Sequence, residues 1–312
     1  MSNDYLDNYP DGLEEPSKND LMAFDQLMSR AISFTNLWLD KDDTSKFIKW
    51  DSEWEKHLQH RQRLINVEGR VEALPWNIYN RLGLKWCAGY GPSQGNLGSC
   101  MLFGHTNSLN ASNLSNAIRL NQNPPEVNAS YAYAVSRGNG TPRWGSGANL
   151  TNMSRWSAEL GNHLVSDVGC YDTRGSALGR VNQASNRNAL KHQSIIIPLA
   201  SPSFDLVYQV CSAGYGIAMG TPRYPTAGRV GSSGLCQPSA WKNGNHAMAF
   251  VAAIDEFIYL LNSHGNRYAG DKYHQGSQPG VYLNRTDFNI LANNGFRFGA
   301  WYANIGEMAQ PK

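Results

Sequence analysis

Two short apolar runs, separated by only two residues, place the strongest constraint on how this chain folds. The first run reads AMAFVAAI at 247–254, and the second reads FIYLL at 257–261. Each run has the length and composition of a buried strand. The two residues between them, Asp255 and Glu256, leave room only for a tight turn. The sequence therefore predicts an antiparallel β-hairpin.

Two polar side chains flank this hairpin. His246 directly precedes the first run, and Asn262 directly follows the second. Antiparallel pairing brings together the two strand ends that lie away from the turn. We therefore expect His246 and Asn262 at the same open end, within the few residues by which the register can shift.

A predicted helix begins at the end of the segment QGNLGSC at 94–100. Apolar residues recur at broadly helical spacing through CMLFGHTNSLNASNLSNAI, and Ser99 is able to cap the first turn. This places Cys100 at a helix N-terminus, where the helix dipole favours a thiolate. Taken alone, a free cysteine is more often a small buried hydrophobe, so both readings of Cys100 stay open at this point.

Composition and charge argue against several classes of partner. The chain has 312 residues, a formal charge of +2 and 17% charged residues, which is not the basic surface of a protein that binds nucleic acid or anionic membranes. No run is apolar enough to span a bilayer, and the N-terminus lacks the features of a signal peptide, so we expect a cytoplasmic chain. The chain has five widely spaced cysteines, an odd number that is unlike a disulfide framework, so we expect reduced thiols. No zinc-like spacing or phosphate-binding glycine loop occurs, so we expect no metal and no cofactor.

The charge also divides the chain into two parts. Residues 1–73 hold 15 acidic and 9 basic residues, a net charge of −6, whereas residues 74–312 have a net charge of +8. Helical periodicity within 1–73 predicts an acidic helical arm, and the glycine- and asparagine-rich texture of 74–312 predicts a mixed domain with many loops. The arm has three alternative roles: a cap on the main domain, a pro-segment, or an attachment to a larger protein assembly.

Three short blocks, QGNLGSCM, NHAM and NSHG, resemble those of the papain-like cysteine peptidases in residue type, order and interval. Cys100 precedes His246 by 146 residues and Asn262 by 162. LPWNIYNRL at 74–82 resembles the start of the mature family domain, and RWGSGANLTN at 143–152 resembles its substrate wall. The resemblance covers about 74–285.

This resemblance implies a catalytic site and a reaction. Cys100 would be the nucleophile of a cysteine endopeptidase, and His246 would form an ion pair with it and act as acid and base. Asn262 would orient the imidazole, and Gln94 would donate a hydrogen bond to the oxyanion. No cofactor is implied.

The resemblance also implies a fold. We expect an α+β, two-lobe papain-like domain over 74–312, with a helical lobe, a β-barrel-like lobe and a cleft between them. Gly145 and Gly147 would let the backbone approach an extended peptide substrate, although simple turn glycines are equally expected there.

The chain departs from the family pattern at three positions. Leu97 replaces a half-cystine, Met101 replaces the tryptophan after the nucleophile, and His264 replaces the tryptophan of NSWG that shields the Asn–His hydrogen bond. The last change predicts a more exposed and weaker bond between Asn262 and His246.

Two other functions remain as alternatives. One is a papain-like structural or assembly protein, for example a component of a phage virion, with weak or no protease activity. The other is an amidase or cell-wall peptidase of a related cysteine-hydrolase type, for which Gln94 and Asn262 would not be expected. His105 and His163 are interpreted as hydrogen-bonded structural residues.

Overall fold

A computed structural model describes the parts of the chain that carry the predicted hairpin and helix. The described residues are 18, 19, 22, 56, 59, 94, 98–120, 125–128, 149–168, 183–199, 202–225, 235–236, 241–264, 269–270, 277–278, 280–295 and 301–304. The predicted boundary between residues 73 and 74 lies outside these ranges, as does almost all of the predicted acidic arm.

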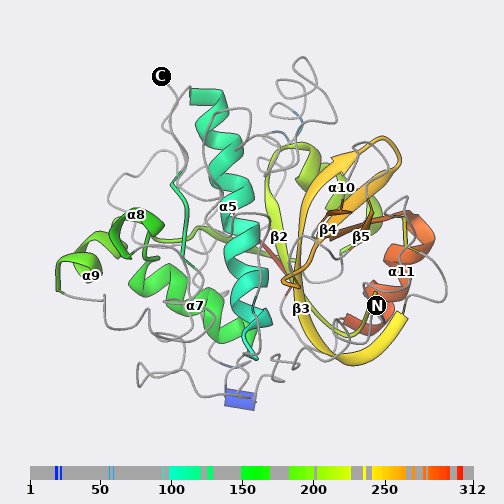
Figure 1. Ribbon diagram of the computed structural model, residues 1–312, viewed down its shortest axis with the longest axis horizontal. Coiled ribbons are helices and arrows are strands. Elements are labelled where there is room, and N and C mark those ends of the chain that lie inside the picture. The colour runs from blue at the N-terminus through cyan, green and yellow to red at the C-terminus, as the bar shows by residue number, and fades with distance from the viewer. Residues whose placement is uncertain are drawn as a thin grey trace.

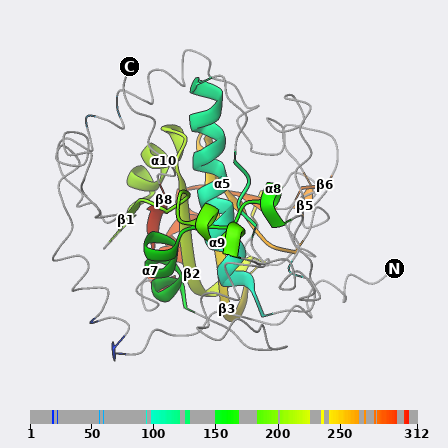
Figure 2. The same cartoon turned by 90° about the vertical axis from the view of Figure 1, so that its left-hand side faces the viewer.

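A long helix, α5, separates the helical side of the molecule from the sheet side (Figure 1). Three shorter helices lie on one side of it, and the main strands lie on the other with two further helices, an arrangement that Figure 2 shows from a second direction. Within the described ranges, the helices are α5 (Cys100–Leu120), α7 (Leu150–Leu160), α8 (Val165–Val168), α9 (Gln183–Ala189), α10 (Phe204–Ser212) and α11 (Arg285–Gly295). The expected α+β composition is confirmed.

The main sheet has six antiparallel strands in the order β1-β8-β2-β3-β4-β7. Its strands are β1 (Ile196–Pro198), β2 (Gly216–Pro225), β3 (Trp241–Ile254), β4 (Phe257–Leu261), β7 (Gly280–Leu283) and β8 (Tyr302–Asn304). A separate pair joins β5 (Ala269–Gly270) to β6 (Ser277–Gln278). β8 lies between β1 and β2 and pairs with both, so residues 302–304 join two strands that come from the middle of the chain.

The predicted hairpin is present as β3 and β4. Ile254 pairs with Phe257 across the turn, and Asp255 takes a positive φ of 51°, as a two-residue hairpin turn requires. The strand differs from the prediction at its other end, because β3 begins at Trp241, before the apolar run. Pairing with β2 extends it, so His246 lies within β3 rather than before it.

Glycines bring α5 close to the backbone of the sheet. A Cβ atom on Gly216 of β2 would lie 2.2 Å from the carbonyl oxygen of Ser108, and one on Gly104 would lie 3.1 Å from that of Met248. The backbone N–H of Gly216 also donates to Ser112 Oγ at 2.9 Å. The helix is therefore fixed against both β2 and β3, with no room for side chains between the backbones at these points.

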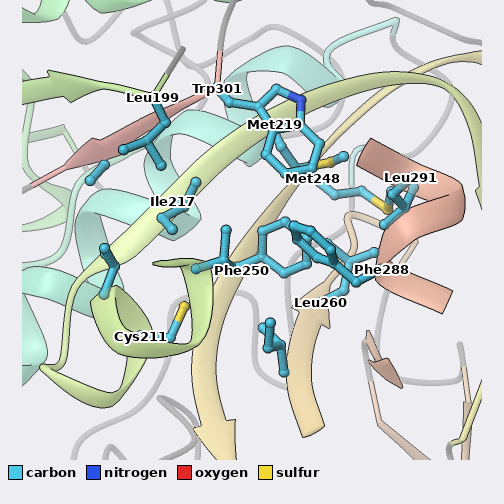
Figure 3. Close-up of a cluster of buried hydrophobic side chains, with 14 of the residues drawn as sticks. Leu199, Cys211, Ile217, Met219, Met248, Phe250, Leu260, Phe288, Leu291 and Trp301 are labelled. Carbon is cyan, nitrogen blue, oxygen red and sulfur yellow. The ribbon is translucent and has the colours of Figure 1, made fainter. Parts of the chain in front are cut away.

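A hydrophobic cluster holds the other face of the sheet against α10 and α11 (Figure 3). Phe288 of α11 packs on Phe250 of β3 at a ring-centroid distance of 5.8 Å and on Trp301 at 5.9 Å. Aromatic pairs of this kind add stability beyond the area that they bury. The hairpin that carries His246 and Asn262 thus rests on a packed core.

Candidate active site

The open end of the hairpin holds His246 against Asn262. The Nε2 atom of His246 lies 2.6 Å from Oδ1 of Asn262, and the backbone N–H of Ser263 donates to the same oxygen at 2.8 Å. Because Oδ1 is an acceptor, the imidazole donates from Nε2, and its Nδ1 atom carries the lone pair. The expectation that the hairpin brings these two side chains together is confirmed.

The second ring nitrogen of His246 is buried and unused. Among the residues that the structure describes, no group forms a hydrogen bond with Nδ1 of His246. Burial has the largest effect on the pKa of His246 and lowers it from 6.5 to about 4. The hydrogen bond to Asn262 acts in the opposite direction, and the positive charge of Lys242 lowers the pKa a little further. The imidazole is therefore neutral at pH 7, and Nδ1 can accept a proton. Unsatisfied buried polar atoms are uncommon in folded proteins, and a catalytic role is one explanation for such an atom.

Cys100 is the first residue of α5, as the sequence predicts. The carbonyl oxygen of Ser99 accepts hydrogen bonds from the backbone N–H groups of Leu102 at 3.0 Å and Phe103 at 3.3 Å. Cys100 has an exposed fraction of 0%. The thiol thus lies at the positive end of a helix dipole and away from solvent.

The packing of α5 on β3 indicates where the thiol lies relative to His246. Contacts advance in the same direction along both elements: Gly104 meets β3 at Met248, and Leu114 packs with the second half of the strand. Cys100 lies one helical turn before Gly104, on the same helix face. It is therefore directed toward the part of β3 that contains His246.

Gln94 joins the same site through Ser263. Its backbone N–H donates to the carbonyl oxygen of Ser263 at 2.8 Å, and Ser263 Oγ donates to Gln94 Oε1 at 2.5 Å. The first bond anchors the backbone of Gln94, and the second places the acceptor oxygen of its side chain toward Ser263. The donor end, Nε2, is then directed away from Ser263. Gln94 is fully buried, next in space to the residue that follows Asn262.

A cluster of three rings encloses the His246–Asn262 bond. The ring centroids of His246 and Tyr224 are 4.4 Å apart, those of His246 and His264 are 4.9 Å apart, and those of Tyr224 and His264 are 6.4 Å apart. His246 and Asn262 each have an exposed fraction of only 1%. The prediction that His264 leaves this bond exposed is therefore wrong, because the imidazole of His264 packs against the ring of His246.

The sequence did not lead us to two residues of the site, Ser263 and Tyr224. Two residues that it did suggest, Gly145 and Gly147, lie outside the described ranges. Ser263 could have been noticed because it sits inside the NSHG block, whereas Tyr224 gives no local signal, since it comes from a different strand. Gly145 and Gly147 lie outside the described residues, so their predicted contact with substrate stays a prediction.

His105 and His163 each form buried hydrogen bonds, in agreement with their interpretation from the sequence as structural residues. His105 bonds through Nδ1 to the hydroxyl of Tyr302 at 2.8 Å and through Nε2 to Ser157 Oγ at 2.9 Å. His163 bonds through Nε2 to Asn186 Oδ1 at 2.9 Å. Both are buried, and burial lowers the pKa of each, to about 3 for His105.

The described part of the chain contains neither a membrane-spanning helix nor a cluster of metal-binding side chains. No described helix combines the length and the hydrophobicity needed to cross a membrane. No three histidine, cysteine or acidic side chains within the described ranges are grouped so that they could hold a metal ion.

Comparison with known proteins identifies the fold. No protein-family model and no curated protein sequence matches this chain. Among solved structures, a digestive procathepsin L2 proteinase from the larval midgut of Tenebrio molitor aligns with a TM-score of 0.51 and 14% identity, covering 99% of this chain and 81% of its own.

Two further solved structures are similar at lower scores. Xylellain, a cysteine protease from Xylella fastidiosa, has a TM-score of 0.47 and 16% identity over 69% of this chain and 82% of its own. The Carica candamarcensis cysteine protease CMS1MS2 has a TM-score of 0.46 and 16% identity over 72% of this chain and 94% of its own. On the procathepsin alignment, this chain has the fold of the papain-like cysteine proteases.

Proposed function

We propose that the protein hydrolyses peptide bonds through an acyl-enzyme on Cys100. One observation carries the proposal: His246 donates from Nε2 to Asn262, which leaves a buried Nδ1 with an unused lone pair on the strand against which the first turn of α5 packs. A neutral imidazole held in one tautomer next to a helix N-terminal cysteine is the arrangement that activates a thiol.

The reaction follows from these groups. Nδ1 of His246 takes the proton of the Cys100 thiol, and Sγ attacks the carbonyl carbon of the peptide. As the C–N bond breaks, His246 returns the proton to the leaving amine, and a thioester remains on Cys100. Water then attacks the thioester with His246 as the base, which releases the carboxylic acid and regenerates the thiol. Asn262 keeps the ring oriented through both steps.

The oxyanion formed in each step needs hydrogen-bond donors. The proposed donors are the backbone N–H of Cys100 and the side-chain Nε2 of Gln94. One hydrogen bond to Ser263 holds the backbone of Gln94 and a second holds its side-chain oxygen, so the residue is anchored before the substrate arrives. Donors that are fixed in advance stabilise a developing charge most effectively.

Because Cys100 is buried, the proposal includes a movement that opens the thiol to a peptide. A covering segment is one source of that burial. The acidic arm predicted at residues 1–73 is our candidate for that segment, in the role of a pro-segment. As an attachment arm, it would instead remain in place within an assembly.

Replacing Gln94 with alanine is expected to lower kcat about 10²- to 10³-fold, because one oxyanion donor is removed. The full chain is incubated at mildly acidic pH, mass spectrometry records any shorter chain that begins near Leu74, and hydrolysis of unfolded casein is then followed. Gln193→Ala is the matched control, since Gln193 bonds to the carbonyl oxygen of Glu159, outside the site. Wild-type protein that cleaves no casein at any stage would favour the assembly alternative and contradict the proposal.

A further inference from the structure

We propose that His264 is a positioning residue that acts on His246 through Asn262, and that it does so only while its own imidazole is neutral. The inference deepens the proposed function and rests on it, because it concerns the orientation of the same catalytic ring. His264 replaces a tryptophan of the family pattern, so this role belongs to the present chain and not to the resemblance.

The amide of Asn262 is held at both of its ends. Its Oδ1 atom accepts from His246 and from the backbone N–H of Ser263, and its Nδ2 atom lies 3.4 Å from Nδ1 of His264. An amide nitrogen only donates, so Nδ1 of His264 must accept and must carry a lone pair. A neutral His264 therefore favours the amide orientation in which Oδ1 faces His246.

A proton on Nδ1 of His264 would oppose this preference. Two donors would then face each other, and their repulsion would favour a turned amide, against the bonds that His246 and the backbone N–H of Ser263 make to Oδ1. Once turned, it would present Nδ2 to the Nε2–H group of His246, and the catalytic ring would lose its acceptor. Loss of that acceptor would release the tautomer and the orientation on which the proposed base depends.

The surroundings of His264 keep it neutral. The titratable groups that face it within the described residues are His246 and Lys242 from β3 and Tyr224 from β2. Burial lowers the pKa of His264 well below 6.5, and repulsion from the protonated form of His246 and from the Lys242 ammonium lowers it further. The acceptor thus persists through neutral and mildly acidic pH, where the proposed peptidase would work.

The test uses NMR of the full chain that carries Cys100→Ala and ¹⁵N-labelled histidine, so the readout does not depend on turnover. His264→Phe keeps a ring but has no acceptor, whereas His264→Gln keeps an acceptor oxygen. We expect the slowly exchanging Nε2–H signal of His246 to disappear in His264→Phe and to remain in His264→Gln. His163→Phe is the matched control, because His163 is also buried and also bonds to an asparagine amide.

Kinetics of the chain with Cys100 intact provide the second readout. His264→Phe is expected to lower kcat by about 10- to 100-fold, with KM changed less than about twofold, because a misplaced base slows the chemistry and leaves binding intact. His264→Gln is expected to recover part of this loss. A purely structural role would not produce this rescue.

The outcomes separate this inference from the proposed function. An unchanged His246 signal in folded His264→Phe would overturn the positioning role, whether or not the chain cleaves peptides. Loss of the signal without any peptide hydrolysis by the Cys100 chain would support the positioning role and contradict only the peptidase. If His264→Phe does not fold, His264→Leu, which also lacks an acceptor, takes its place, and an unchanged His246 signal in the folded variant overturns the proposal.

Discussion

Replacing Cys100 with alanine is expected to lower the rate of peptide hydrolysis by about 10⁴- to 10⁶-fold, and replacing His246 with alanine is expected to do nearly the same. The thiol and the imidazole act as one unit. Without the imidazole the thiol is not deprotonated, and without the thiol the imidazole has no nucleophile to activate. The double variant should therefore be little slower than either single variant. Casein hydrolysis measured under the activating conditions above checks this result.

Cys236→Ala is the matched control for the nucleophile. Cys236 is a half-buried thiol whose backbone N–H donates to the carbonyl oxygen of Tyr282, at the edge of the sheet. Its replacement should leave hydrolysis within about twofold of wild type, the range left by small surface effects on stability. Retention of more than a tenth of wild-type activity in Cys100→Ala would contradict the assigned nucleophile.

The second large effect is a loss of stability in acid. His105 and His246 are buried and neutral, with pKa values lowered by burial to about 3 and about 4 from an ordinary 6.5. Between pH 6.5 and these values, the unfolded chain binds a proton at each site and the folded chain does not. Stability is therefore retained above pH 6.5 and lost as the pH falls toward 4.

The expected loss is large on the scale of protein stability. From pH 7 to pH 4.5, each of the two histidines should lower the free energy of unfolding by about 2.5 kcal/mol. Together this is about 5 kcal/mol, which is comparable with the whole stability of many domains. His163 and His264 act in the same direction, since burial lowers the pKa of each. Urea unfolding of the Cys100→Ala chain at the two pH values measures the loss without self-cleavage.

A variant of the first histidine tests the cause of this loss. His105→Gln removes one titrating group that bonds to Tyr302 and Ser157, outside the proposed catalytic residues. The variant should be less stable at pH 7, but its stability should fall by about 2.5 kcal/mol less between pH 7 and pH 4.5. An unchanged pH dependence in this variant would show that the buried histidines are not responsible.

The elements that were predictable from the sequence are those specified by neighbouring residues. The turn at Asp255 and Glu256 and the helix that begins at Cys100 both follow from local patterns, and the pairing of β3 with β4 then brings His246 to Asn262. The resemblance to papain-like peptidases added the fold, on three short blocks.

The remaining features depend on contacts between distant segments. The insertion of β8 between β1 and β2 has no local signature, because it is set by pairing such as that of Ala303 with Ile197 and Ile217. Tyr224 reaches His246 only because β2 pairs with β3 through an irregular register near Thr221. The burial of His264 likewise depends on the rings of His246 and Tyr224, which come from two other strands. From the sequence, the replacement of a tryptophan by His264 suggested an exposed Asn262–His246 bond, whereas the three rings pack together around it.

Alkylation of the thiols tests the central claim most directly. The protein is incubated under the activating conditions and treated at pH 6 with limiting iodoacetamide, and the modified residue is identified by mass spectrometry. An ordinary thiol is almost fully protonated at this pH and reacts slowly. We expect modification concentrated at Cys100, and a loss of that preference in His246→Ala. Equal modification of Cys100 and the other four cysteines, or a preference for Cys100 that survives in His246→Ala, would contradict the Cys100–His246 pair.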